Sequence, residues 1–238
     1  MPHVPLFASQ AFEGKSPRGL FGDVVEELDW SVGQVLDALR KAGLDKQTLV
    51  VFSSDNGPWL IFDHHGGSAG PLRDGKGSTY EGGMRVPGIF WWPGKISAGV
   101  VTPELGSTMD VFTTTIKFCG GTVPTDRAID GIDLAPVLTG QGPSPRQSFF
   151  FYRGSQLYAA RKGLLKAHFI TRSGYGPDAE EKHESPLLYH LGEDPGERFN
   201  VAEKYPQVIQ KIQQEVSEHQ KTMTPGENQL AKIAAKRN

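Results

Sequence analysis

Cysteine is nearly absent from the 238-residue sequence, which contains only Cys119. A single cysteine excludes an internal disulfide framework and leaves the cellular compartment open. The apolar neighbours Ile116 and Phe118 predict a buried thiol that packs as a small hydrophobic group and is not a nucleophile. The sequence also lacks an apolar run of the ~18 residues that a membrane-spanning helix needs, so we expect no membrane partner.

Neither sign of charge dominates. The 25 lysines and arginines balance 27 acidic residues and leave a formal net charge of −2, which argues against a nucleic acid as partner. Glycine and proline are abundant instead, with 29 and 17 residues, above their usual shares of about 7% and 5%. This composition predicts many tight loops, and loops carry function.

Residues 23–42 have the clearest periodic pattern, because their apolar residues recur at spacings of three and four. The spacing of Asp23 and Glu26 predicts a capping box at the start of this helix. Residues 48–54 are short, β-branched and apolar on both parities, which predicts a strand covered on both faces of a parallel or mixed sheet. Helix followed by strand indicates an α/β fold. The helix face consists of Val25, Leu28, Val32, Val35, Leu36 and Leu39.

Further along, residues 86–94 predict a second buried strand, and residues 108–120 a helix that ends before Gly120. From there the pattern changes to alternating strands and a last helix, which predicts a small antiparallel sheet with a C-terminal helix. We therefore expect two domains, residues 1–143 and residues 144–238. The last helix places Val208, Ile212 and Val216 on one face.

The stretch "VVFSSDNGP", residues 50–58, ends a strand with Asp55 and Asn56 side by side. Open α/β sheets bind ligands beyond the carboxyl ends of their strands. Two adjacent oxygen-bearing side chains suit a hard cation such as Ca²⁺ or Mg²⁺. The alternative is ordinary turn chemistry, in which both side chains bond their own backbone.

Lys76 lies between two glycines in "RDGKGSTYEGG", within a long glycine-rich segment of residues 57–85 that predicts a functional loop. Glycine on both sides allows close approach of a ligand, and an ammonium is a point charge for an oxyanion. A solvated surface lysine is the alternative. His3 is a lone histidine near the start of the sequence, and such residues are more often structural or exposed. Four loop residues either line an entrance or pack the loop: Trp59, Phe62, His64 and His65.

Three stretches together resemble the type I sulfatases of the arylsulfatase A kind, in the alkaline phosphatase-like superfamily: "SDNGP", "GKGSTYEGGMRVP" and "DGIDLAPVLTG". The later "LYAARKGLLKAHF" and "LLYHLGEDPGERFNV" resemble the C-terminal subdomain of that family. The resemblance implies an alkaline phosphatase-like α/β sandwich that lacks its N-terminal half, followed by the small antiparallel sheet and helix.

The resemblance also implies a set of site residues. Asp55 and Asn56 match two ligands of a divalent cation, usually Ca²⁺, with Mg²⁺ as the second choice. Lys76 and His3 match residues that bind the sulfate and take part in catalysis, and one of them protonates the leaving group. The assignments agree chemically, because a cation and fixed positive charges stabilise the charge that grows on the leaving oxygen.

Two motifs of the family are absent. Sulfatases carry a Cys or Ser in "C/S-x-P-S-R" that is oxidised to formylglycine, and this sequence has no such motif. The family's early Asp-Asp pair for the cation is absent as well. We therefore expect the C-terminal half of a sulfatase, inactive alone, with a sheet edge that is open to self-association.

The predicted function is hydrolysis of sulfate esters of aryl or carbohydrate substrates. One alternative is a non-catalytic module that binds sulfate or sulfated glycans through His3 and Lys76. Another is a phosphoryl-transfer relative of the same superfamily, since a fold does not fix the ester. The partner is a sulfated small molecule or glycan, and the resemblance implies a lysosomal, periplasmic or secreted location.

Overall fold

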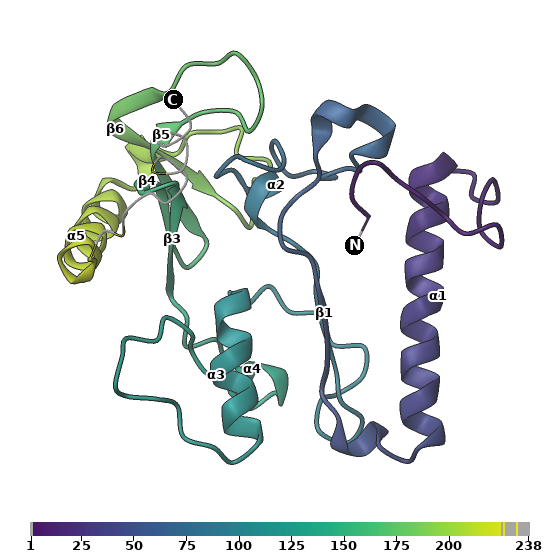
Figure 1. The fold of residues 1–238 in the computed structure, drawn as a ribbon. Helices are drawn as coiled ribbons and strands as arrows, with labels where there is room; N and C mark the ends of the chain where they lie inside the picture. The colour runs from purple at the N-terminus through teal and green to yellow at the C-terminus, as the bar shows by residue number, and fades with distance from the viewer. Residues whose placement is uncertain (1, 225, 227–231, 233–238) are drawn as a thin grey trace. The chain divides into compact units, whose positions relative to one another are not determined.

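The chain divides into two units in the computed structural model, which describes residues 2–224, 226 and 232 (Figure 1). The first unit comprises Met1–Lys76 and Tyr80–Gln147, and the second comprises Gly77–Thr79 and Ser148–Asn238. Across the described residues, no helix has the length and apolar character needed to cross a bilayer.

Helix α1, Gly19–Lys41, confirms the helix expected from the spacing of apolar residues. It begins four residues earlier than expected, and the capping box at Asp23 is wrong. Asp23 is a residue of the helix and not its N-cap, and it is 2% exposed. Its carboxylate accepts hydrogen bonds from the backbone N–H groups of Ser16, Gly14 and Lys15, at 2.7, 2.9 and 3.1 Å. Asp23 therefore holds the preceding turn against the first part of the helix.

The pKa of Asp23 lies below its ordinary value of 3.8, because the N–H groups of Ser16 and Gly14 favour the carboxylate more than burial disfavours it, and Lys15 adds to the effect. A carboxylate with a lowered pKa in the folded state stabilises the fold. This stabilisation is fully present above the pKa of the unfolded state, and it is lost as the pH falls through the pKa of the folded state. We expect the amide signals of residues 14–16 to titrate below about pH 4. In Asp23→Asn this titration should vanish, as followed by NMR, whereas the exposed Asp29→Asn should keep it. A titration that persists in Asp23→Asn would contradict this role.

Strands β1, Val50–Ser53, and β2, Gly88–Trp91, confirm the two strands expected in the first unit. They pair antiparallel, with Val50 opposite Trp91 and Ser53 opposite Gly88. The parallel or mixed sheet expected here is therefore not found among the described residues, where this sheet is antiparallel. Full burial is wrong for both strands, since all four residues of β1 are half-buried and Ile89 of β2 is 57% exposed. A sheet of two strands among the described residues is too narrow to be covered as the centre of a large sheet is.

The segment between these strands is less irregular than expected. The short helix η1, Asp45–Gln47, precedes β1, while η2, Leu60–His65, and α2, Glu81–Met84, lie inside the stretch that the sequence predicts as one loop. Neither inner helix has a sustained apolar period, which is why the sequence pattern did not predict them.

Helix α3, Thr108–Phe118, confirms the helix expected near residue 108, and its cap is Ser107. The Ser107 side chain accepts from the N–H of Met109, and the Asp110 carboxylate accepts from the N–H of Ser107, which completes a capping box. Burial of Cys119 is wrong: the thiol is exposed, because Cys119 ends α3 beyond its last turn. A short helix, α4, spans Ala135–Leu138.

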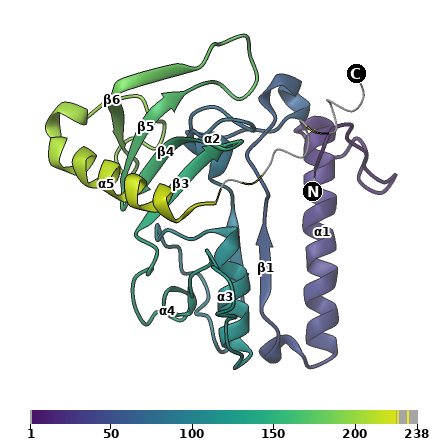
Figure 2. The ribbon, with the colours of Figure 1, turned by 60° about the vertical axis from the view of Figure 1, so that its left-hand side comes forward.

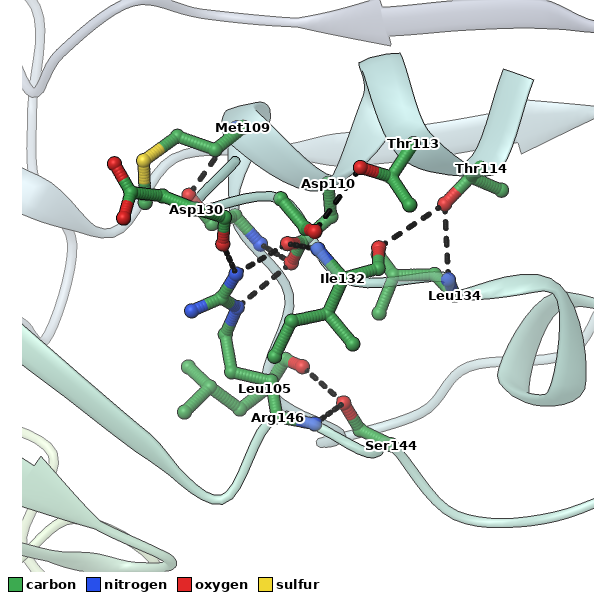
Figure 3. A network of polar contacts seen from close by, with 12 residues as sticks. Leu105, Met109, Asp110, Thr113, Thr114, Asp130, Ile132, Leu134, Ser144 and Arg146 are labelled. Atoms are coloured by element: carbon green, nitrogen blue, oxygen red, sulfur yellow. Dashed lines mark hydrogen bonds and ion pairs between the residues drawn. The ribbon is translucent and has the colours of Figure 1, made fainter. Parts of the chain in front are cut away.

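A buried polar network joins α3 to the chain that follows it (Figure 3). The Arg146 guanidinium forms an ion pair with the Asp110 carboxylate, and Nε donates to Oδ2 at 2.8 Å. The same carboxylate accepts from the N–H of Ile132 at 2.8 Å, and Arg146 also donates to the carbonyl of Asp130 at 2.8 Å. The loop around residues 130–134 is thereby fixed to the first turn of α3.

The second unit is a four-stranded antiparallel sheet with the order β3-β4-β5-β6, followed by a helix (Figure 2). Its helix α5, Pro206–Thr222, packs Ile212 and Val216 on the sheet, as its predicted apolar face requires. The sheet and helix confirm the prediction for the C-terminal part. The strands are β3, Ser148–Arg153; β4, Gln156–Lys162; β5, Leu165–Thr171; and β6, Glu181–His190, with the short helix η3, Ala202–Lys204, before α5.

Candidate functional site

The chain leaves β1 in a tightly packed turn. The N–H of Gly57 donates to the carbonyl of Gly83 at 3.0 Å, so the strand exit is bonded to helix α2. A Cβ at Gly57 would lie 1.7 Å from the carbonyl oxygen of Gly82, and the close approach of these backbones therefore requires glycine. This packing fixes where the two residues before Gly57 lie.

Asp55 is exposed and Asn56 is half-buried in this turn. The Oγ of Ser54 donates to the carbonyl of Asn56 at 3.0 Å and so bonds the turn to itself. Among the described residues, no side-chain hydrogen bond of Asp55 or Asn56 to the backbone of the turn is found.

These two residues fit part of a site for a hard cation. A carboxylate and an amide oxygen are donors that Ca²⁺ takes in proteins, usually among six to eight oxygens. The described residues contain no group of three or more His, Cys, Asp and Glu residues placed to hold a metal. Asp55 and Asn56 would offer two donors to such a cation, which would need further ligands.

Lys76, expected from the sequence as an anion-binding residue, lies beside the same strand exit. Its backbone N–H donates to the carbonyl of Pro58 at 2.8 Å, two residues after Asn56. The Lys76 Nζ lies 3.5 Å from Nε2 of His3 and 4.8 Å from the centre of the Trp59 ring. Residues 73 positions apart in sequence thus meet as an ammonium and an imidazole over an indole face.

His3 has a contact on each nitrogen of its ring. Its Nδ1 lies 2.8 Å from the carbonyl oxygen of Val4, and its Nε2 is the nitrogen that faces Nζ of Lys76. These two contacts place the imidazole ring beside the lysine.

The other four loop residues differ in whether they contact Lys76 and His3. His64 and His65 are exposed at the end of η2 and have no contact with the Lys76 and His3 side chains among the described residues. Phe62 packs edge-on against Trp59, with ring centres 4.6 Å apart. Trp59 itself touches both predicted site residues, since its ring centre lies 5.7 Å from that of His3. Its contact with Lys76 was not predicted, and a sequence pattern cannot signal it.

Two family models match the sequence. The sulfatase model matches residues 1–121, and the model for the C-terminal region of aryl-sulfatase matches residues 144–238. The N-acetylgalactosamine-6-sulfatase of Mus musculus is 44% identical, over 96% of this chain and 48% of its own length. The arylsulfatase A of Homo sapiens is 43% identical, over 89% of this chain and 45% of its own length.

Solved structures give the same picture. The crystal structure of PsFucS1 sulfatase from Pseudoalteromonas sp. has a TM-score of 0.84 at 30% identity, over 93% of this chain and 46% of that one. The structure of BT4656 in complex with its substrate D-glucosamine-2-N,6-O-disulfate has a TM-score of 0.61 at 26% identity, over 84% and 39%. The chain thus spans about half the length of the curated relatives it matches.

Proposed function

Because the chain belongs to the sulfatase family and has part of its alkaline phosphatase-like fold, we propose that the protein hydrolyses sulfate esters of aryl or carbohydrate substrates. In this proposal the chain supplies the cationic side of the sulfate site. The observation that carries it is the meeting of Lys76 and His3, 3.5 Å apart, beside the turn that presents Asp55 and Asn56.

The chemistry of the ester explains the choice of residues. Cleavage of the S–O bond leaves negative charge on the bridging oxygen, and a fixed ammonium lowers the free energy of that state more than that of the bound ester. Lys76 donates to the sulfate oxygens in this role. His3 binds the sulfate beside it, and one of the two gives a proton to the leaving oxygen.

Asp55 and Asn56 are proposed to hold a divalent cation, Ca²⁺ by preference, together with ligands outside this pair. The cation would neutralise sulfate charge and hold the ester in place. The nucleophile belongs to the C/S-x-P-S-R segment, which these 238 residues do not contain. We therefore expect the 238-residue chain alone to bind sulfated ligands without turning them over. Hydrolysis of an aryl sulfate by this chain alone would contradict that expectation.

A sulfated sugar is the favoured substrate class within this proposal. One matched structure holds a disulfated glucosamine described as its substrate, and one relative is named for a sulfated N-acetylgalactosamine. A lysosomal, periplasmic or secreted location agrees with such a substrate and remains part of the proposal.

Lys76→Ala tests the anion site directly. We expect N-acetylgalactosamine-6-sulfate, titrated in the presence of Ca²⁺, to bind the variant about 10 to 100 times more weakly, because a hydrogen bond to a charged group is worth about 1.5 to 3 kcal/mol. NMR titration measures the change. Lys95→Ala, which removes an exposed lysine elsewhere in the first unit, should bind as the wild type does. Equal affinity in Lys76→Ala and wild type would contradict the assignment.

A further inference from the structure

Trp59 lies between the loop of residues 57–85 and the anion site, by which we mean Lys76 and His3. Its N–H donates to the carbonyl of Gly66 at 3.0 Å, and its own carbonyl accepts from the N–H of Phe62 at 3.1 Å. A Cβ at Gly66 would lie 2.0 Å from the Trp59 carbonyl oxygen, so that backbone approach requires glycine. Both peptide groups of Trp59 are therefore held in place by the loop.

The indole ring is held as well. The Phe62 ring packs against it in an edge-on arrangement, at 4.6 Å between ring centres, which is a favourable geometry for two aromatic groups. The residue is half-buried, so one part of the ring is covered while another stays open to neighbours. A ring fixed at its backbone and packed by a second ring presents its face in one direction.

That face carries the Lys76 ammonium. The 4.8 Å between Nζ and the ring centre is within the ~6 Å at which an indole attracts a cation. A lysine side chain has four rotatable bonds and samples many rotamers when it is free in solvent. On the indole face, and with Nε2 of His3 at 3.5 Å, the ammonium has a defined place.

We infer that Trp59 is a positioning residue for the anion site, which holds the Lys76 ammonium against His3 in the orientation that receives a sulfate. The inference rests on the proposed function for the identity of the anion. Trp59 acts through Lys76 and does not itself need to touch the ligand. Its contribution is a lysine that is already ordered before the anion arrives, so that less conformational entropy is lost on binding.

The contact is measurable without any activity. In the 238-residue chain labelled with ¹³Cε-lysine, the Lys76 Hε signals should lie upfield of those of exposed lysines, because they sit over an aromatic face. Lys76→Arg assigns the signals. Trp59→Leu should return them to the range of exposed lysines, and Trp59→Phe should keep part of the shift. Lys166, whose Nζ lies 4.2 Å over the Phe151 ring, is a ring-shifted reference that should not change.

The consequence for binding is modest and specific. The loss of a cation–π contact at a partly exposed site predicts that Trp59→Leu binds inorganic sulfate about two to five times more weakly than wild type. The affinity of Trp59→Phe should lie between those of Trp59→Leu and wild type. Trp30→Leu, which removes a half-exposed tryptophan from α1, should change neither readout.

Two results would overturn the inference. One is a wild-type Lys76 signal in the range of exposed lysines, which remains decisive if Trp59→Leu does not fold. The other is equal sulfate affinity in wild type and a folded Trp59→Leu. A Lys76 signal that is ring-shifted and depends on Trp59, in a chain that binds no sulfate or sulfated sugar, would support the contact and count against the proposed function alone.

Discussion

Asp110→Ala is expected to lower the free energy of unfolding of the first unit by about 3 to 5 kcal/mol, because it leaves the Arg146 guanidinium buried without its carboxylate. The side chains of this pair are 0% and 8% exposed. The variant also removes the acceptor for the N–H groups of Ser107 and Ile132, so the cap of α3 and the loop near residue 132 lose their bonds together.

Tryptophan fluorescence during urea unfolding measures this effect in the right unit, since all four tryptophans belong to the first unit. Asp37→Ala is the matched control, because Asp37 pairs with Arg40 on the surface of α1 and both side chains are about half exposed. Exposed ion pairs of this kind contribute little to the free energy of unfolding. Similar unfolding midpoints for Asp110→Ala and Asp37→Ala would show that the Asp110 network is not a main source of stability.

The pattern of neighbouring residues predicted most of the helices and strands, but few of the contacts between residues far apart in the sequence. The spacing of Leu28, Leu36 and Leu39 predicted α1 because a helical period is a property of neighbours in sequence. The apolar face that this pattern predicts is partly exposed, since Val35 is 56% exposed. Asp23 was taken for a cap because a carboxylate that bonds an earlier turn looks identical in sequence to one that caps a helix.

The candidate site shows the same limit. The flanking glycines singled out Lys76 and a family resemblance added His3, but no periodicity or spacing connects residues 73 positions apart. Trp59 was left with two interpretations, because the direction of its ring depends on backbone bonds to Gly66 and Phe62 that exist only in the folded loop. Arg146 was not predicted as the partner of Asp110, 36 residues away, for the same reason.

The second unit contains a buried polar cluster that the sequence did not suggest. Lys166, His168 and Glu197 are all 0% exposed. Oε1 of Glu197 lies 3.2 Å from Nζ of Lys166 and 2.6 Å from Nε2 of His168, so one carboxylate serves both side chains. Glu197 has a left-handed backbone with φ of 50°, which costs a non-glycine residue about 1 to 3 kcal/mol.

The turn around Glu197 sustains this conformation. The N–H of Glu197 donates to the carbonyl of Asp194 at 3.1 Å, and the Asp194 carboxylate accepts from the N–H groups of Arg198 and Phe199 at 2.6 and 2.8 Å. A strained residue that is not glycine, held by such a turn, indicates that its side chain is needed. The side chain delivers the negative charge that Lys166 requires in the interior.

Glu197→Gln should therefore destabilise the second unit by about 3 kcal/mol or more, because the amide keeps the shape of the side chain and removes the charge. Adding Lys166→Met removes the opposite charge while keeping a long side chain, so the double variant should recover a large part of the loss. Hydrogen exchange of the β5 amides measures both. Lys182→Met, a change at a lysine whose side chain is 73% exposed, should leave that exchange unaltered. If the double variant is as unstable as the sum of its two single changes, the cluster is not held together by the charge of Glu197, and packing around the turn would be the better explanation.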